Sequence, residues 1–357
     1  MGEFRCGRPV LISHGDMVGL IATAESLDDE MLGRMSALTG GAARLVLTDA
    51  RWRHLGMAVE DAGAVVPDEL SAARILNLAC AEDLDFAGQS LVPSRVELAG
   101  LNLARLALLL PAVVSFAVDT HSGEALSALV RVEAEAIDRY RERQMSKVEM
   151  IADTPVPLEM APNSRFVVFR GGEGLRDQIA VVVSGKAGEP DPSKPVLVRL
   201  HSACLTGDLF GSLKCDCGDQ LRGAVAYMAE HGGGVVLYLD QEGRGNGISN
   251  KLRAYRLQAE GHDTFEADQI LGFDLDQRHF EFAANMLKQL GFTSVKLLTN
   301  NPAKIAALQQ AGLTVVGSQR LNGRLNSHNR GYLSAKRERA GHMIDKALLG
   351  VTGIGQE

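Results

Sequence analysis

The sequence predicts an α/β (α+β) protein built from two domains, and three observations lead to that prediction. The chain has 357 residues, which is more than one ordinary hydrophobic core accommodates. Short runs rich in β-branched residues alternate along it with stretches whose apolar residues recur at helical spacing. Prolines cluster within residues 150–165, where this periodicity is lost, as is typical of a connection between structural parts.

The proline cluster sets the expected domain boundaries. A charged pattern typical of a helix covers residues 130–148 and ends just before the cluster. We therefore expect four parts: a smaller N-terminal α/β domain over residues 1–152, a linker over 153–165, a C-terminal domain over 166–345 and a tail over 346–357. In the C-terminal domain we expect a mixed sheet flanked by helices.

The N-terminal domain contains both kinds of pattern. Residues 26–38 have the periodicity of a helix, and residues 43–47 form an apolar run typical of a strand. Side chains suited to chemistry are scattered through this domain, and isolated polar residues on loops are usually solvated. We therefore expect no active site there.

The C-terminal domain alternates more regularly. Buried strands are expected over residues 195–200, 234–239 and 295–298, which are continuous apolar runs. A helix is expected over residues 282–290, because apolar residues recur there at helical spacing. The following Gly291 suits the end of that helix.

Composition excludes several classes of protein. Hydrophobic residues make up 46% and charged residues 23%, as in ordinary soluble proteins. The apolar stretch over residues 101–116 is interrupted by polar residues and proline, so we expect no membrane partner. The net charge of −7 disfavours nucleic acid as a partner. Five cysteines, and an N-terminus without the apolar core of a secretory signal, favour a reduced, cytoplasmic protein.

Three cysteines in one short stretch form a candidate metal site. Cys215 follows Cys204 by eleven positions, and Cys217 comes two positions later. Three thiolates can hold a zinc ion and leave its fourth position open for water, as in catalytic zinc sites. Packing of buried thiols is the alternative, but the intervening segment is polar and contains glycine, and Cys6 and Cys80 lie far away. The spacing therefore favours a metal.

Two further segments could bind an anionic ligand. Residues 240–247 carry three closely spaced glycines, with Glu242 able to accept hydrogen bonds from a base and Arg244 able to clamp phosphate. Residues 297–304 place a strand end before a helix start, where free N–H groups and Lys304 could hold an anion. Taken alone, each segment fits a solvated loop or a well-capped helix equally well.

Together these segments resemble GTP cyclohydrolase II over about residues 160–345. The family's motifs correspond to segments in the same order along this chain. H-S-E-C-L-T-G-D corresponds to residues 201–208, C-D-C-G to 215–218, Q-E-G-R to 241–244, N-K-x-R-A-Y to 250–255, D-x-R to 276–278, L-L-T-N-N-P-x-K to 297–304 and N-x-x-Y-L to 329–333.

The resemblance implies a particular reaction and its cofactors. GTP would be hydrolysed with opening of its imidazole ring, releasing formate and pyrophosphate. The product would be 2,5-diamino-6-hydroxy-4-(5-phosphoribosylamino)pyrimidine, at the first step of riboflavin biosynthesis. Cys204, Cys215 and Cys217 would hold one Zn²⁺ per subunit, and Mg²⁺ would accompany the triphosphate. We expect a homodimer with GTP as its small-molecule substrate.

The resemblance also implies the catalytic residues. Tyr255 would act as a proton donor or hydrogen-bonding group near the opening ring. Asp276 would be a proton acceptor, and Arg278 the nucleophile toward the α-phosphorus. Because arginine stays protonated, an electrostatic clamp on phosphate is the alternative role for Arg278.

Ten residues fall on or beside the GTP-contacting positions of the family. They are Arg199, His201, Ser202, Gln220, Glu242, Gly243, Arg244, Thr264, Thr299 and Lys304. Glu242 would read the guanine edge, since a buried acceptor left unpaired penalises other bases.

The sequence departs from the family pattern beside these positions. Ala203 replaces a glutamate next to the first cysteine, and Asp240 replaces a basic residue before Q-E-G-R. Asn246 and Ser249 replace apolar residues. These changes leave the metal ligands and the catalytic residues in place.

The N-terminal domain faintly resembles the first half of 3,4-dihydroxy-2-butanone 4-phosphate synthase. The similarity lies at residues 15–17 and 22–25, whereas the acidic run that precedes the first of these segments in that enzyme is missing. The domain is also too short for the second half. We expect it to lack synthase activity and to serve structure, dimerisation or regulation.

Two alternatives to this enzyme remain open from the sequence. One is a paralogue that acts on a related nucleotide or in pyrimidine catabolism. The other is a non-catalytic GTP-binding regulatory protein, which the retained cysteines and proton-transfer residues disfavour.

Overall fold

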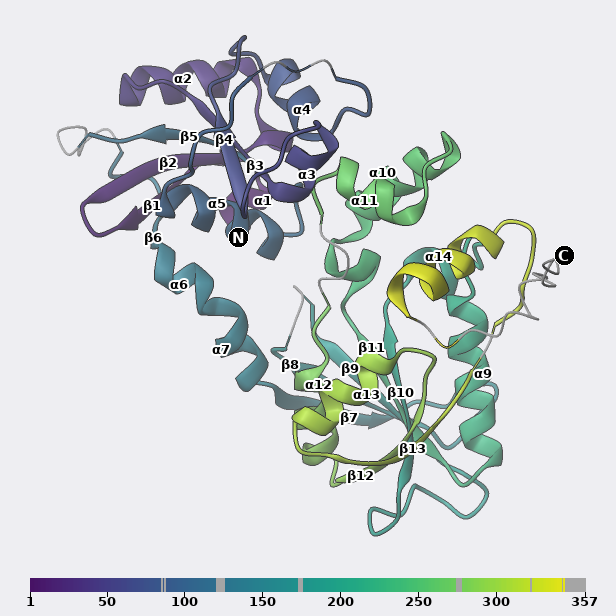
Figure 1. Ribbon diagram of the computed structural model, residues 1–357. Helices are drawn as coiled ribbons and strands as arrows, with labels where there is room; N and C mark the ends of the chain where they lie inside the picture. Colours follow the sequence, from purple (N-terminus) through teal and green to yellow (C-terminus); the bar gives the residue numbers. More distant parts are fainter. Residues whose placement is uncertain are drawn as a thin grey trace, which may run out of the picture. The chain divides into compact units, whose positions relative to one another are not determined.

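The chain forms two compact units (Figure 1). The computed structural model describes residues 1–84, 86, 88–119, 126–172, 176–273, 278–321, 323–341 and 343. Unit 1 lies within Met1–Arg141 and Asn246–Gln277, and unit 2 lies within Glu142–Gly245 and Arg278–Glu357. Among the described helices, none combines the length and apolar character needed to cross a bilayer.

Unit 1 is built around a six-stranded sheet of order β4-β3-β5-β2-β1-β6. The strands are β1 (Val10–His14), β2 (Met17–Thr23), β3 (Arg44–Thr48), β4 (Ala62–Val65), β5 (Ala112–Ala117) and β6 (Arg131–Glu133). Neighbouring strands pair antiparallel except β1 and β6, which are parallel. β3 confirms the strand expected at residues 43–47.

Helices cover both faces of this sheet. The helices of unit 1 are α1 (Gly2–Arg5), α2 (Asp29–Thr39), α3 (Asp49–His54), α4 (Ala72–Cys80), α5 (Arg95–Leu106), α6 (Ala134–Asp138), α10 (Ile248–Ala259) and α11 (Thr264–Ile270), with a short 3₁₀ turn, η1 (Ala24–Ser26). Because successive strand residues face opposite sides, the sheet supports two cores. One core holds α2 and α4, and the other holds α1 and α5.

The ends of α2 follow from its sequence. The Asp28 side chain accepts a hydrogen bond from the backbone N–H of Met31, which caps the start of the helix. Gly40 adopts a φ of 64° directly after the helix, a conformation that favours glycine. The structure thus places this helix close to the expected residues 26–38.

Unit 2 contains a seven-stranded mixed sheet of order β13-β12-β10-β11-β9-β8-β7. The strands are β7 (Glu149–Pro155), β8 (Arg165–Arg170), β9 (Gln178–Val183), β10 (Val196–Ser202), β11 (Gly234–Leu239), β12 (Ser294–Leu298) and β13 (Thr314–Gln319). The four strands β10, β11, β12 and β13 pair with one another in parallel. β7, β8 and β9 are antiparallel to their neighbours, including β9 to β11. The mixed sheet expected from the sequence is confirmed.

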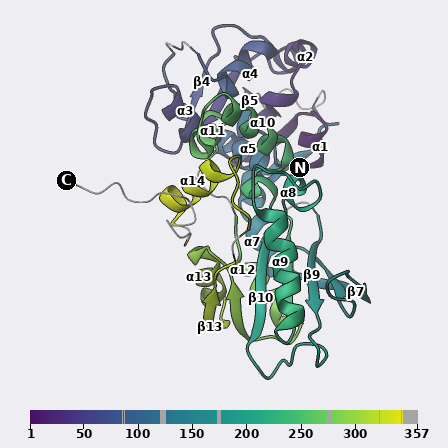
Figure 2. The ribbon, with the colours of Figure 1, turned by 90° about the vertical axis from the view of Figure 1, so that its right-hand side faces the viewer.

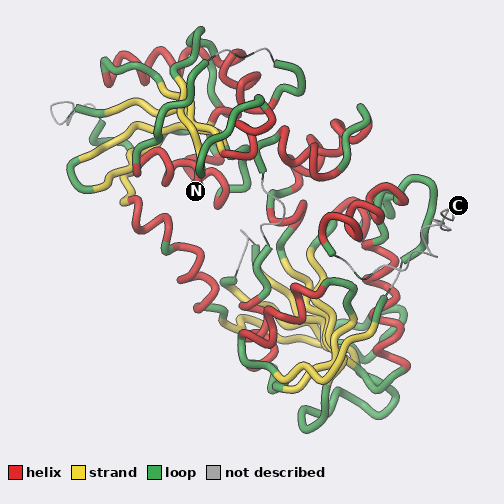
Figure 3. Tube along the Cα trace, in the orientation of Figure 1, coloured by secondary structure: helices red, strands yellow, loops and turns green. Residues whose placement is uncertain are grey.

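Helices also cover both faces of the second sheet (Figures 2 and 3). The helices of this unit are α8 (Leu205–Asp208), α9 (Cys217–Glu230), α12 (Glu281–Gln289), α13 (Pro302–Gln310) and α14 (Arg330–Ala340), with the 3₁₀ turn η3 (Glu242–Gly245); α7 (Tyr140–Ser146) spans the boundary between the units. α12 and α13 contribute to the core on one face, and α9 to the core on the other. Gly291, with a φ of 87°, follows α12 as expected.

The segment expected to be a linker is in part a strand. Residues 149–155 form β7, the edge strand of the second sheet, and Pro155 pairs with Arg165 at its end. All seven residues of β7 are exposed, so the alternation that marks a half-buried strand is absent from this sequence. An edge strand tolerates proline because its outer N–H groups need no partner strand.

Three further features differ from the expected ones. The helix expected over residues 130–148 is divided into β6, α6 and α7. Unit 2 begins at Glu142 rather than after residue 152, because β7 joins its sheet. Residues 246–273, expected in the C-terminal domain, pack into unit 1, where α11 lies against α3. We call residues 246–273 the inserted segment.

Candidate active site

The candidate site in unit 2 lies where three neighbouring strands end. β11, β10 and β12 are adjacent and parallel, so their carboxyl ends meet at one edge of the sheet. Ligands of open α/β sheets bind at that edge. Cys204 follows β10, Glu242 follows β11, and Thr299 follows β12.

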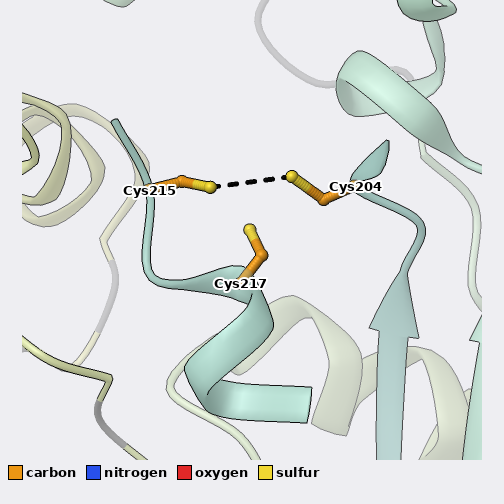
Figure 4. Close-up of side chains that lie close together, drawn as sticks. All are labelled: Cys204, Cys215 and Cys217. Atoms are coloured by element: carbon orange, nitrogen blue, oxygen red, sulfur yellow. Dashed lines mark hydrogen bonds between the residues drawn. The ribbon is translucent and has the colours of Figure 1, made fainter. Parts of the chain in front are cut away.

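Cys204, Cys215 and Cys217, the thiol cluster, converge at this edge (Figure 4). Their three sulfurs lie within 4.8 Å of one another, and the sulfurs of Cys204 and Cys215 are 3.6 Å apart. Two sulfurs bound tetrahedrally to zinc at about 2.3 Å are separated by about 3.8 Å. The spacing of the thiol cluster therefore fits a single zinc ion, with a fourth position left for water or substrate.

The backbone around the thiol cluster is closely packed. Cys204 precedes α8, and Cys217 begins α9. A Cβ atom on Gly207 of α8 would lie 2.7 Å from the Cys215 sulfur and 3.1 Å from the Cys204 sulfur. Glycine is therefore required at this position, which was not singled out from the sequence.

The thiols influence one another's protonation. The hydrogen bond with Cys204 raises the pKa of Cys215 to about 11. A divalent cation held by the three sulfurs would reverse this effect, because ligand thiols are deprotonated. Metal binding at the thiol cluster would therefore release protons.

Asp208 connects the first cysteine to a buried histidine. Its carboxylate accepts hydrogen bonds from His201 Nε2 at 3.0 Å, from Tyr238 Oη at 3.1 Å and from the backbone N–H of Cys204 at 2.9 Å. The His201 and Tyr238 rings also stack, with centroids 5.6 Å apart. Asp208 and Tyr238 were not predicted as site residues: Asp208 lies in the recognised motif, whereas a tyrosine within a buried strand carries no sequence signal.

His201 is held neutral with one ring nitrogen available. Burial lowers its pKa, so the imidazole is uncharged near neutral pH. Because Nε2–H donates to Asp208, Nδ1 is the acceptor nitrogen, and it is buried with no hydrogen-bond partner among the described residues. A buried acceptor of this kind is suited to a substrate N–H or O–H group.

Arg199 is buried and bridges several elements. Its guanidinium donates to the carbonyl of Leu298 at 3.0 Å and to Gln220 Oε1 at 2.6 Å. Gln220 in turn donates to Asp216, between the last two cysteines, at 2.5 Å. Burial lowers the pKa of Arg199, and its Nε is buried without a partner among the described residues. Arg199 and Gln220, which the resemblance places at GTP-contacting positions, are thus connected through Asp216 to the segment between Cys215 and Cys217.

Ser202 joins the end of β10 to the loop after β11. Arg278 Nη1 donates to Ser202 Oγ at 3.3 Å, and Ser202 Oγ donates to Gln241 Oε1 at 3.0 Å. Gln241 also donates to the carbonyl of His279 at 2.5 Å. This chain of hydrogen bonds fixes Arg278 at the sheet edge.

Two cations lie over one aromatic ring at the same edge. The guanidinium of Arg278 and the ammonium of Lys304 lie 5.5 Å and 5.1 Å from the centroid of Phe280. Lys304 is buried and donates to the carbonyl of Leu200 at 2.7 Å. The two cations are suited to an anionic ligand.

Thr299 and the start of α13 have the expected cap. The Thr299 hydroxyl accepts from the backbone N–H of Asn301 at 3.0 Å, and Asn301 Oδ1 accepts from Ala303 N–H at 2.9 Å. Pro302 is the first residue of the helix. The Thr299 side chain is thus buried and takes part in the hydrogen bonds at the start of α13.

The turn after β11 holds a strained residue. Gly243 and Arg244 have φ values of 61° and 60°, and the left-handed conformation of Arg244 costs about 1–3 kcal/mol in a non-glycine residue. Glu242 is buried, and its carboxylate accepts from the backbone N–H of Leu205 at 2.6 Å. Glu242 is therefore tied to the residue that follows the first cysteine.

Asp240 is neutralised by Arg176. The Arg176 guanidinium and backbone N–H both bind the Asp240 carboxylate, the backbone contact at 2.9 Å. Asp240 is buried, and this pairing raises the pKa of Arg176. The negative charge of Asp240, which replaces a basic residue of the family pattern, is thus paired with the positive charge of Arg176, two residues before β9.

Two predicted site residues belong to unit 1. Tyr255 is half-buried on α10, with Lys251 Nζ 5.5 Å from the centroid of its ring. Thr264 is the first residue of α11, which Asp263 caps. Asp276 lies outside the described residues.

A cluster of three thiols at the carboxyl edge of parallel strands, beside buried cationic groups, is the arrangement expected of a hydrolase with an anionic substrate. A sequence profile of GTP cyclohydrolase II matches residues 149–320. The GTP cyclohydrolase-2 of Azospirillum brasilense is 42% identical over 356 residues, covering 95% of this chain and 91% of its own. The chain belongs to the GTP cyclohydrolase II family and is a hydrolase.

Other known proteins extend this comparison. The GTP cyclohydrolase-2 of Xylella fastidiosa strain 9a5c is 40% identical over 346 residues, covering 96% of this chain and 86% of its own. Both relatives therefore match the N-terminal domain as well as the C-terminal one. A two-domain 3,4-dihydroxy-2-butanone 4-phosphate synthase from A. baumannii covers 90% of this chain and 98% of its own, with 17% identity and a TM-score of 0.33.

Proposed function

We propose that this chain hydrolyses GTP with opening of the imidazole ring, releasing formate and pyrophosphate. The product is 2,5-diamino-6-hydroxy-4-(5-phosphoribosylamino)pyrimidine, at the first step of riboflavin biosynthesis. The convergence of Cys204, Cys215 and Cys217 within 4.8 Å, at the edge where three parallel strands end, carries this proposal.

Zinc held by the thiol cluster would lower the pKa of water toward neutrality, as the hydrolysis requires. The surrounding side chains orient the ligands. Asp208 holds the backbone of Cys204 and the ring of His201 through one carboxylate. The acceptor Nδ1 of His201, buried with no hydrogen-bond partner among the described residues, could then accept a hydrogen bond from a substrate N–H group.

Recognition of the guanine edge is assigned to Glu242. Its carboxylate is buried and already accepts one backbone hydrogen bond, at Leu205, so it is kept as an acceptor. A base without matching N–H donors would leave this acceptor unpaired, at a cost of about 1–3 kcal/mol. Gly243 permits close approach of the backbone at this point.

The triphosphate is assigned to the cationic groups of the sheet edge. Arg244 lies in the strained turn η3. The charged groups of Arg278 and Lys304 both lie over the ring of Phe280. Arg278 can act as a nucleophile toward the α-phosphorus or as an electrostatic clamp on it, and its permanent charge favours the clamp. Mg²⁺ bound to the triphosphate would complete the neutralisation.

Tyr255 and Asp276 are assigned to proton transfer during ring opening. Tyr255 lies on α10, and Lys251 Nζ lies 5.5 Å from the centroid of its phenol ring. A phenol can donate a proton to a ring nitrogen as the ring opens. Asp276 would accept a proton. We further propose one Zn²⁺ per subunit, a homodimer and a cytoplasmic location.

The experiment that tests the function is a product analysis. Zinc-loaded protein is incubated with GTP and Mg²⁺, and formate, pyrophosphate and the diaminopyrimidine are each measured. The proposal expects all three products, with Tyr255→Phe losing formate release. A folded, zinc-loaded protein that leaves GTP intact would overturn the proposal.

A further inference from the structure

The inserted segment, residues 246–273, folds as part of unit 1 together with residues 1–141. It carries Tyr255 and Thr264. We propose that the N-terminal domain is the scaffold that positions this segment for the reaction, and that Glu25 and Arg51 are positioning residues. The inference rests on the proposed function, because that function is what places Tyr255 and Thr264 in the GTP site.

Glu25 anchors the helix that carries Tyr255. Its side chain is only 13% exposed, and Oε2 accepts hydrogen bonds from Leu110 N–H at 2.9 Å and from Arg253 Nη1 at 2.7 Å. Arg253 also donates to Asn250 on the same helix at 2.7 Å. The ion pair therefore fixes α10 two residues before Tyr255, from a position in η1 that is more than two hundred residues away in sequence.

Arg51 anchors the other end of the inserted segment. Its side chain is buried, and Nη1 donates to the carbonyl of Ile270, the last residue of α11, at 2.9 Å. Its remaining nitrogens donate to carbonyls at the end of α4, among them Leu78 at 2.8 Å and Ala81 at 2.8 Å. One cation thus satisfies the carboxyl ends of two helices, one from each part of unit 1.

Burial lowers the pKa of Arg51 to about 10, so the guanidinium stays charged near neutral pH. The neighbouring Thr48 hydroxyl donates to the carbonyl of Gly272 at 2.7 Å. The end of the inserted segment is therefore held by two side chains of the N-terminal domain.

A strained residue of the N-terminal domain contacts the start of the inserted segment. Leu108 has a φ of 59°, which is unusual for a residue with a branched side chain, and its carbonyl accepts from Asn250 Nδ2 at 3.3 Å. A Cβ atom on Gly247 would lie 3.0 Å from the Cβ of Leu108. Strain of this kind persists only where the surroundings determine the conformation. The strained turn at Leu108 therefore fits the close approach of the inserted segment.

The apolar contacts alone would leave the segment poorly fixed. α10 and α11 have 12 and 7 residues, and isolated helices of such lengths are marginal in water. Their small core consists largely of the segment's own residues, with Leu110 from the N-terminal domain and Leu76 packed against it. The polar anchors at Glu25 and Arg51 therefore decide where the two helices sit.

This role also accounts for a motif without an assigned use. Glu25 ends the segment, residues 22–25, in which the N-terminal domain resembles a synthase. In this chain its carboxylate is engaged by Arg253 and by the backbone of Leu110. In the proposed role, Glu25 therefore holds α10, the helix that carries Tyr255, and takes no direct part in the reaction.

The test compares Glu25→Gln with Glu30→Gln in the full-length, zinc-loaded protein. Glu30 lies in the same unit on α2, and its exposed side chain pairs with Arg34 at the surface. Among the described residues no contact of Glu30 with the inserted segment is seen, so the variant removes the same charge as Glu25→Gln. Formate and pyrophosphate release from GTP are measured separately, with zinc content and amide hydrogen exchange of α10.

For Glu25→Gln we expect formate release to fall on the order of tenfold, because a small displacement of Tyr255 misaligns the ring-opening step. Pyrophosphate release should fall less than about threefold, since its phosphate contacts lie outside the inserted segment. Amides of α10 should exchange faster, and zinc content should stay unchanged. Adding Arg253→Gln should lower formate release little further, because the Glu25–Arg253 ion pair is already lost and the second change removes in addition only the contact of Arg253 with Asn250 within α10.

Arg51→Lys keeps the positive charge but loses the several N–H donors of the guanidinium. It should likewise lower formate release more than pyrophosphate release. A parallel fall of both products in Glu25→Gln, or kinetics and α10 exchange equal to those of Glu30→Gln, would overturn the inference. If the wild-type protein releases no formate from GTP, the proposed function fails. Hydrogen exchange of α10 alone then decides whether Glu25 holds the helix.

Discussion

The carboxylate of Asp208 accepts a hydrogen bond from Nε2 of His201 at 3.0 Å. The same carboxylate accepts a hydrogen bond from the backbone N–H of Cys204, so one buried side chain orients both an imidazole and the first residue of the thiol cluster. Carboxylates in this position fix the tautomer and orientation of groups around a metal. The arrangement identifies Asp208 as a positioning residue for the site.

Replacing Asp208 with asparagine tests this relationship. Asp208→Asn keeps the shape but loses the anion, and we expect zinc affinity and kcat each to fall by about 10- to 100-fold. Competition with a zinc chelator and initial rates of formate release provide the measurements. Wild-type zinc affinity and kcat in a folded variant would contradict a positioning role.

The thiol cluster should be essential for both metal binding and turnover. Cys204→Ser, Cys215→Ser and Cys217→Ser should each lower zinc content and abolish formate release, because a neutral hydroxyl is a poor zinc ligand. Cys6→Ser is the matched control, since Cys6 is exposed and distant in sequence. Metal analysis of purified protein decides the outcome, and full zinc content in Cys204→Ser would exclude this residue as a ligand.

Gly207→Ala should disturb the thiol cluster without altering a ligand. The added Cβ would approach the Cys215 sulfur to 2.7 Å, so either the sulfur or α8 has to move. We expect zinc affinity to fall on the order of tenfold. Gly223→Ala on α9 is the control, because its Cβ meets nothing within 4 Å, and it should be neutral or stabilising by about 0.5–1 kcal/mol. Equal zinc affinity in both variants would contradict the close packing.

The pair of Arg176 and Asp240 should matter for substrate affinity. Arg176→Ala removes the guanidinium that pairs with the buried Asp240 carboxylate, near the proposed site for a polyanion, so KM for GTP should rise several-fold. The double variant Arg176→Ala with Asp240→Asn removes that charge and should recover most of the loss. Failure of the second substitution to lower KM again would show that Arg176 acts in another way.

Stability should depend on the protonation of His54. Burial lowers the pKa of His54 in the folded protein, so the unfolded chain binds more protons over the interval below about pH 6.5. The free energy of unfolding should therefore fall as the pH drops through that interval. His54→Gln can still donate to the carbonyl of Glu82 but does not titrate, and should flatten this dependence. Urea unfolding at several pH values measures it, and identical slopes would refute the assignment.

Much of the second sheet could be predicted from the sequence because its central strands are buried on both faces. β10, β11 and β12 are continuous apolar runs, and each was expected within two residues of its observed bounds. β7 could not be predicted, because an edge strand with every residue exposed has no alternation to recognise. The proline that ends it resembled a linker residue instead.

The candidate site was predictable where chemistry depends on spacing along the chain. Three cysteines within fourteen positions indicated a metal before any fold was known. Tyr238 and Arg176 gave no such signal, since each acts only through a partner brought close by the sheet. The packing of the inserted segment against Glu25 and Arg51 was equally hidden, because those contacts join residues more than two hundred positions apart.

The account is tested most directly by formate release from GTP in zinc-loaded protein, compared between wild type and Cys204→Ser. We predict stoichiometric formate and pyrophosphate from the wild type and no formate from a folded variant that lacks zinc. Formate release that persists after the loss of Cys204 and of the metal would contradict the central claim that the thiol cluster carries the hydrolysis.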